Sequence, residues 1–303
     1  MYYLKAISIC ICVLCSLNGF SQSKFDKFLK PSDSLNTNRK RAVIISEISI
    51  VTATLIGLDR LWYKDFQRSS FKTANDNDEW LQVDKIGHSF SSYHLTRLGA
   101  ETMAWSGANK KAQLINGAAL SLGFLTTVEI FDGFSEEWGF SWGDMAANFG
   151  GTGLYVGQEL LWQEQRISLK YSFHRTSFAN QNPDKLGSGL LEEALKDYNG
   201  QTYWLSGNLY SFFKESKLPK WLNLAIGYGG EGMLSARENT SILFPNQQHT
   251  RQFYLSLDVD LTKIPTKSRV LSTIFSIVNT VKIPAPTLEI SGKRGIAFHL
   301  LYF

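Results

Sequence analysis

The feature that most constrains this chain is the segment 84–151, where polar and charged side chains interrupt apolar, helix-like sequence. Ionisable groups inside apolar helices are costly to bury unless they are paired. We therefore expect these interruptions to mark a site at one end of a helical bundle. They form three short blocks, which hold Asp84, Lys85 and His88, then Glu129, Asp132 and Ser135, then Ser141, Asp144 and Asn148.

Four helices are expected before residue 164, because apolar residues recur there at helical spacing. Ser141 with Asp144 forms an S-x-x-D capping pattern, which would start the fourth helix. Gly153 and Gly157 have the G-x-x-x-G spacing that permits close helix contact, although the same glycines would suit any buried helix of a bundle. The predicted ranges are 41–63, 80–105, 111–131 and 141–162, with a polar loop at 65–79.

From about residue 165 the hydrophobic period shortens to two, which is typical of strands with one apolar face. An outward apolar face with small or polar residues opposite resembles an outer-membrane β-barrel. Against closure, His299 would share the lipid-facing side with Leu301 and Phe303, so a sheet packed on the helices is the alternative. Strands are expected at 169–173, 222–229, 253–261 and 287–303, with helical pieces near 190–198 and 269–281.

These patterns together predict an α+β protein. A four-helix bundle over residues 41–163 would precede an antiparallel, strand-rich half over 164–303, and a barrel-like closure of the strands stays open. Residues 22–40 are polar and contain Pro31, so they are expected to form a linker. A chain of 303 residues is long enough to bury a sizeable core.

The first 21 residues have the pattern of a secretory signal peptide, with an uncleaved anchor helix as the alternative. Lys5 precedes an apolar run, and Gly19 and Ser21 provide small residues before a cleavage expected near Gln22. Only this segment contains cysteines, at positions 10, 12 and 15, so a mature chain would lack disulfides and thiolate ligands. Leu14 before Cys15 does not fit a lipid-modified start.

Several functions are excluded by composition and motif. The net charge of +4 is too mild to indicate nucleic-acid binding, and no basic cluster has interleaved aromatic residues. The chain has no G-x-S-x-G elbow, Walker loop, H-E-x-x-H motif or Rossmann fingerprint. No cofactor can be named from the sequence.

The polar blocks offer acid–base chemistry and a set of metal-compatible groups. Asp84 and His88 are four residues apart, so a carboxylate could orient an imidazole as a general base requires; an ordinary helix-surface pair has the same spacing. Glu129, Asp132 and Asp144 could join His88 in a cluster compatible with a divalent metal. In the alternative, each residue has a structural role instead. Asp132 forms a turn, Asp144 completes a helix cap, and Glu129 forms an ion pair with Lys85 or Arg97.

The three blocks in order resemble a known family. Asp84-Lys85-x-x-His88, Glu129-x-x-Asp132-Gly133-x-Ser135 and Trp138-Gly139-Phe140-Ser141-x-x-Asp144-x-x-x-Asn148 are similar to the YfiM-like family of uncharacterised, predicted periplasmic lipoproteins. The similarity covers about residues 80–162. The Asp84-Lys85-x-x-His88 start, the later Glu129 and the Asp144-x-x-x-Asn148-x-x-Gly151 pattern also resemble the VanZ-like membrane proteins, less closely. The resemblance implies an envelope location and supplies no activity, substrate or catalytic residue.

Two functional hypotheses follow. In the first, the chain is a secreted structural or binding module in the periplasm or on the outer membrane, whose partner is membrane lipid or another envelope component. In the second, it is an envelope hydrolase or transferase acting on lipid or glycan. The candidate catalytic residues are then Asp84, His88, Glu129 and Asp132, and the candidate binding residues are Lys85, Ser135, Asp144 and Asn148.

Overall fold

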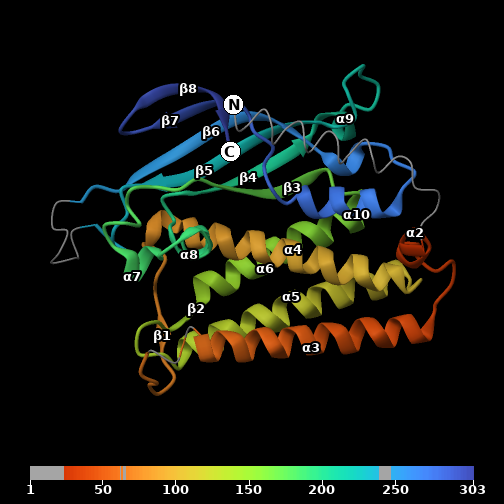
Figure 1. Cartoon of the computed structure of the whole chain (residues 1–303), viewed down its shortest axis with the longest axis horizontal. Coiled ribbons are helices and arrows are strands. Elements are labelled where there is room, and N and C mark those ends of the chain that lie inside the picture. Colours follow the sequence, from red (N-terminus) through yellow and green to blue (C-terminus); the bar gives the residue numbers. More distant parts are fainter. Residues whose placement is uncertain (1–23, 62, 64–65, 239–246) are drawn as a thin grey trace.

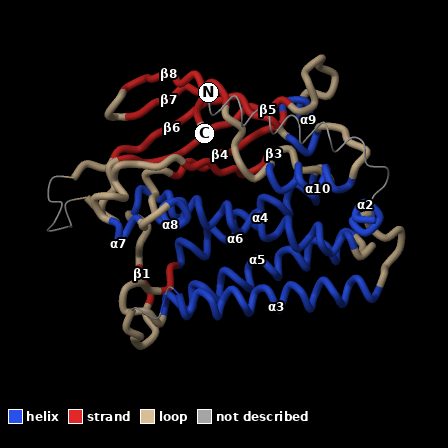
Figure 2. Tube along the Cα trace, in the orientation of Figure 1, coloured by secondary structure: helices blue, strands red, loops and turns tan. Residues whose placement is uncertain are grey.

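The computed structural model describes residues 24–61, 63, 66–238 and 247–303. Within them, long helices pack beneath one antiparallel sheet (Figure 1), and Figure 2 separates the helical and strand regions by colour. This arrangement confirms the predicted α+β class with an antiparallel, strand-rich second half. The predicted signal peptide at 1–21, with its cysteines, lies outside the described residues.

The four expected helices are present, and α4 is the one that contacts the other long helices and the sheet. A short helix, α2 (Lys24–Leu29), lies inside the predicted linker, and α3 starts four residues earlier than expected. The Asn109 side chain caps α5 by accepting a hydrogen bond from the backbone of Ala112. The long helices are α3 (Thr37–Leu61), α4 (Val83–Trp105), α5 (Lys110–Gly133) and α6 (Trp142–Leu161).

Glycines allow α4 to lie against α5 and α6 at backbone distance. A Cβ atom on Gly117 of α5 would overlap the carbonyl oxygen of Thr96, and one on Gly151 of α6 would overlap that of Ser89. The predicted contact at Gly153 and Gly157 is wrong, because a Cβ on either would have nothing within 4 Å. Spacing alone did not reveal which side of α6 faces its neighbour.

The sheet contains six antiparallel strands in sequence order, with β3 and β8 at its edges. It is open rather than closed into a barrel in the part of the chain that is described. One strand, β4, was not predicted, and the predicted strand 287–303 is a hairpin of two strands. The strands are β3 (Ile167–Phe173), β4 (Gln201–Asn208), β5 (Leu222–Glu231), β6 (Thr250–Val259), β7 (Ala285–Ser291) and β8 (Gly295–Tyr302).

Short elements complete the two layers. The helical pieces expected near 190–198 and 269–281 are α8 (Leu190–Lys196) and α10 (Arg269–Val278), and each is shorter than predicted. Beside the long helices, β1 (Thr73–Ala74) pairs in parallel with β2 (Phe140–Ser141). The remaining pieces are α7 (Pro183–Leu186), α9 (Leu209–Phe212), η3 (Trp80–Gln82) and η4 (Leu261–Lys263).

The sheet buries its polar face and exposes its apolar face. On the buried side, the Lys170 ammonium lies 2.7 Å from the Asp258 carboxylate, and Lys282 donates to the backbone oxygen of Leu257 at 2.8 Å. We call the opposite side the outer sheet face. Its exposed apolar residues include Leu205, Leu224, Ile226, Phe253, Leu255, Leu257, Ile290, Ile296 and Phe298.

A β-bulge corrects the expected position of His299. The register between β7 and β8 shifts between Ala285 and Thr287, so β8 has one extra residue there. His299 consequently faces the buried side, where its ring lies 2.7 Å from the carboxylate of Glu289, while Leu301 is exposed. The sequence argument against a lipid-facing edge at His299 therefore does not hold, because strict alternation fails across a bulge.

Two of the long helices, α3 and α5, are long and apolar enough to cross a membrane by length and composition. The most apolar window of α3 is only 6% buried, against 28% for α5. A core helix of a soluble protein would be mostly buried, so α3 leaves much of its apolar surface without cover from the described residues.

Candidate functional site

The site helix α4 begins after a strained left-handed turn. Trp80, Leu81 and Gln82 have φ values of 48°, 52° and 63°, which side chains of this size rarely adopt. The sheet holds the turn, because the Tyr228 hydroxyl donates to the Leu81 backbone oxygen at 2.5 Å and Arg251 donates to the Gln82 side chain at 2.7 Å. The expected α-helical start at Trp80 thus moves to Val83, one residue before Asp84.

The Lys85 ammonium lies among three carboxylates. Its Nζ atom is 2.6 Å from Asp76, 2.8 Å from Asp144 and 3.4 Å from Asp84. Burial alone would lower the pKa of Lys85, but the negative charges of Asp84 and Asp144 outweigh it and raise the pKa. Lys85 therefore stays charged and neutralises part of the cluster. Asp84 also accepts a hydrogen bond from the Tyr198 hydroxyl at 2.7 Å, which ties α4 to the segment before β4.

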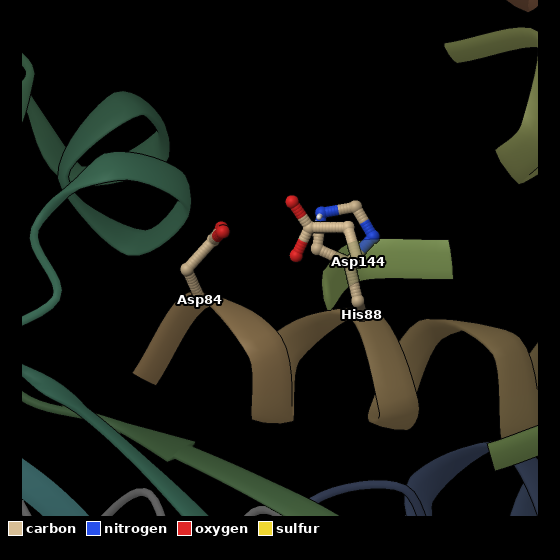
Figure 3. A group of neighbouring side chains, drawn as sticks. All are labelled: Asp84, His88 and Asp144. Atoms are coloured by element: carbon tan, nitrogen blue, oxygen red, sulfur yellow. Dashed lines mark ion pairs between the residues drawn. The ribbon is translucent and has the colours of Figure 1, made fainter. Parts of the chain in front are cut away.

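His88 lies one helical turn after Asp84 and faces α5 and α6. Its Nδ1 atom is 3.2 Å from the Asn148 amide oxygen and 3.7 Å from Glu129, and its Nε2 atom is 3.7 Å from Asp144. Burial would lower the pKa of His88, but the charges of the surrounding carboxylates raise it above the ordinary value. Figure 3 shows Asp84 and His88 on the same side of α4 with Asp144 beside the imidazole. Asn148 and Glu129, rather than Asp84, lie nearest to Nδ1.

Glu129 is the most buried acid of the cluster, with 1% of its surface exposed. One carboxylate oxygen accepts a hydrogen bond from the backbone of Ser141 at 3.2 Å, and the other has no hydrogen-bond partner among the described residues. Burial raises the pKa of Glu129 to about 8, against the opposing charge of His88. Glu129 therefore holds a proton to higher pH than a solvated glutamate does, and its unpartnered oxygen lies 3.7 Å from Nδ1 of His88.

Ser141 caps α6 as predicted, by accepting a hydrogen bond from the backbone of Asp144 at 3.1 Å. The return bond of a capping box is absent, because Glu129 from α5 takes the Ser141 backbone N–H instead. The Asp144 carboxylate is thereby left to contact Lys85, and burial raises its pKa to about 6 despite the charges of His88 and Lys85. The Ser141 hydroxyl in turn donates to Asp76 at 2.6 Å.

Two of the sequence-predicted residues have partners of their own. The Asp132 carboxylate accepts a hydrogen bond from the Tyr63 hydroxyl at 2.7 Å, and burial raises its pKa to about 7. Ser135 accepts from the backbone of Glu137 at 3.3 Å, in the loop after α5. The structure brings together six of the predicted residues, whereas among the described residues Asp132 and Ser135 form no hydrogen bond or ion pair with His88. The six are Asp84, Lys85, His88, Glu129, Asp144 and Asn148.

Sequence reasoning missed Asp76 and Tyr198. Asp76 reaches the cluster because β1 pairs with β2, placing Ala74 opposite Ser141. Only two residues make up each of these strands, so no periodic signal marks them. Tyr198 precedes β4, the one strand of the six-stranded sheet that was not predicted. Burial would raise the pKa of Asp76, but the hydrogen bonds from Lys85 and Ser141 outweigh this effect and lower the pKa.

The arrangement supports proton transfer or cation binding more readily than anion binding. One ligand atom each from Asp84, His88 and Asp144 lies within 4.8 Å of the other two. Small movements of these side chains would let all three coordinate one metal ion. Lys85 already contacts its carboxylates, so the predicted role in binding an anionic group has less support. The cluster has more carboxylates than cationic groups, which favours uptake of protons or of a cation.

Residues 74–158 match a protein family described as a predicted periplasmic lipoprotein (DUF2279). This match supports a periplasmic or envelope location and similarity to an uncharacterised lipoprotein family. The match covers less than a third of the 303-residue chain, but it contains Asp76, Lys85, His88, Glu129 and Asp144. Comparison with curated proteins and with solved structures gave no significant match.

Proposed function

We propose that the chain is a binding module of the cell envelope that associates with the outer membrane through its apolar surfaces. The observation that carries the proposal is the orientation of the sheet, whose polar residues face inward and whose apolar residues face outward. Ile226 and Leu255 lie opposite each other on neighbouring strands, and they are 58% and 45% exposed. A contiguous apolar patch of this kind on a sheet marks a protein or membrane contact.

The alternation on β5 and β6 gives the reason for this preference. Ile226 is exposed while its neighbour Ala225 is buried, and Leu257 is exposed while Asp258 is buried beside Lys170. A sheet in water lowers its free energy by placing the apolar side chains inward. The opposite arrangement is stable where the outward face meets lipid, as in membrane strands. α3 offers a second apolar surface, on the side of the helical layer away from the sheet (Figure 1).

The test is flotation with vesicles made from phosphatidylethanolamine and phosphatidylglycerol. The double substitution Ile226→Lys/Leu255→Glu replaces one exposed cross-strand pair with an ion pair and leaves the net charge unchanged. We expect this variant to float at least fivefold less efficiently. The control Ile226→Val/Leu255→Val keeps the face apolar and should float like the natural chain. Equal flotation of all three proteins, or none by any, contradicts the proposal.

A second candidate function has its own support in the polar cluster. The unpartnered oxygen of Glu129 and the raised pKa of His88 suit an envelope hydrolase or transferase in which His88 exchanges protons. Asp84 and Asp144 would then hold a divalent cation with His88 or act as acids. The structural alternative uses the same groups to fix α4, α5 and α6 relative to one another.

Calorimetric titration with Zn²⁺ and Mn²⁺ separates these two uses of the cluster. Binding that is lost in His88→Ala and retained in Asp132→Asn supports the cation site, because Asp132 bonds to Tyr63 outside the cluster. Absence of binding, with a lower unfolding midpoint for His88→Ala, supports a structural network. If His88→Ala leaves stability unchanged and abolishes a cellular phenotype, the purely structural use is wrong.

A further inference from the structure

An apolar groove of about 280 Å³ runs between α3 and α5. Its α3 side spans residues 44–52, which is about 12 Å of helix at 1.5 Å per residue. The opposite wall includes Gly123, where a side chain would meet nothing within 4 Å. The lining residues are Ile44, Glu47, Ile48, Val51, Thr52, Asn116, Ala119, Leu120, Gly123 and Phe124.

The groove's polar groups are already engaged, so its free surface is apolar. Glu47 accepts hydrogen bonds from the Thr102 hydroxyl at 2.7 Å and from the Asn116 amide at 3.0 Å. Asn116 also donates to the backbone oxygen of Gly99 at 3.0 Å. Because these bonds satisfy the amide and the carboxylate, a polar ligand would gain few hydrogen bonds there, whereas a hydrocarbon chain would cover apolar wall.

Two basic residues, Lys40 and Arg41, precede Ile44 by one turn on the α3 side of the same groove. Val43 packs in one cluster with Ala108 and is joined by Ala112, so the first turns of α3 and α5 lie side by side at the same end (Figure 1). Within the described residues, no ion pair or hydrogen bond engages the charged groups of Lys40 and Arg41 at this end. By contrast, Lys110 and Arg39 bond to Glu159 and to backbone oxygens.

We propose that this groove binds one acyl chain of an anionic phospholipid, whose headgroup lies against Lys40 and Arg41. The apolar wall matches the hydrocarbon chain, and the basic end matches the phosphate, so both halves of such a lipid meet complementary chemistry. The inference rests on the proposed membrane association and adds a defined lipid site to it. A second copy of the chain would bring the same basic end and so lacks this charge complementarity.

The experiment uses phosphatidylglycerol with a diazirine on one acyl chain, mixed into phosphatidylcholine vesicles with the full chain. Mass spectrometry should locate the photolabel within residues 44–52 and 116–124. Gly123→Trp fills the groove and should lower this labelling about tenfold, equivalent to about 1.4 kcal/mol. Gly153→Trp is the matched control, because Gly153 is also an exposed helical glycine with open space around it, on α6.

A second variant tests the headgroup end without filling the groove. Lys40→Gln/Arg41→Gln should lower labelling by the anionic lipid at least tenfold, and labelling by the same diazirine on phosphatidylcholine much less. This variant changes only exposed or half-exposed residues, so it provides an answer even if Gly123→Trp folds poorly.

The outcomes separate the groove from the membrane association. Flotation without photolabel in the groove, or label that Gly123→Trp leaves unchanged, overturns the groove and leaves the association intact. Absence of both flotation and label overturns both proposals. Cross-links between α3 helices of two copies, without lipid label, would show that a second copy occupies the groove and would also overturn the inference.

Discussion

Removing Lys85 should destabilise the fold far more than removing a surface lysine. The side chain of Lys85 is 13% exposed, and Asp144, its 2.8 Å partner, is 6% exposed. Breaking a buried ion pair by removing one partner costs about 3–5 kcal/mol. Because Asp76 and Asp84 remain partly hydrated, we expect Lys85→Met to lower the free energy of unfolding by about 2–4 kcal/mol at pH 8.

The loss should depend on pH in a defined direction. The pKa of Asp144 is already about 6, above its unfolded value, and removal of the Lys85 charge raises it further. Below that pKa the folded variant holds a proton that neutralises the uncompensated charge, so stability falls as pH rises through it. The difference between the variant and the natural chain should therefore shrink by at least about 1 kcal/mol between pH 8 and pH 5.

The assay is urea unfolding of the natural chain, Lys85→Met and Lys185→Met at pH 5 and pH 8. Lys185 pairs with Glu137, but the two side chains are 51% and 37% exposed, so its removal should cost less than about 1 kcal/mol. Equal losses for the two variants at pH 8 would refute the reasoning. A larger Lys85→Met loss at pH 5 than at pH 8 would do the same.

Two further outcomes are expected. The folded pKa of Glu129, about 8, lies above its unfolded value, so the free energy of unfolding falls as pH rises from 5 to 8. Glu129→Gln should reduce this fall by about 2–4 kcal/mol, measured by urea unfolding at the two pH values. An unchanged pH dependence contradicts the assignment. Gly117→Ala would press on the Thr96 backbone and should cost about 1–3 kcal/mol, whereas Gly123→Ala in open space should cost nothing; similar unfolding midpoints would contradict the close helix contact.

The helices could be predicted from the sequence because their signals are local. The cap of α6 at Ser141 needs only its own side chain and the backbone three residues later. The left-handed turn before α4 could not be predicted, because Trp80 and Leu81 carry no glycine-like signal. Tyr228 and Arg251, which lie far away in sequence, hold that turn.

The strands were harder to predict because the sheet does not alternate cleanly. In β4, Trp204 is buried beside the exposed Leu205, so two large apolar residues follow one another on opposite faces. The bulge in β8 changes the side of the sheet that His299 faces, and no residue type in β8 predicts the bulge. Apolar and non-apolar residues alternate clearly only where the inward-facing residues are polar or small, as on β5 and β6, and there the apolar face could be predicted.

The candidate site was predicted as a group but not as a set of contacts. His88, Glu129 and Asp144 converge because α4 lies close to α5 at Gly117 and close to α6 at Gly151, and the predicted glycine spacing did not point to these positions. Asp76 and Tyr198 join through pairings that only the assembled fold provides.

The central claim, that the outer sheet face contacts lipid, is tested most directly by spin labelling. A nitroxide on Ile226→Cys, with Asp184→Cys in α7 as the solvent-exposed control, reports collisions with oxygen, which concentrates in lipid, and with a water-soluble nickel chelate. In vesicles, we expect the label at position 226 to collide readily with oxygen and to be shielded from nickel, and the label at 184 to behave in the opposite way. Equal access of nickel to both labels would contradict the claim.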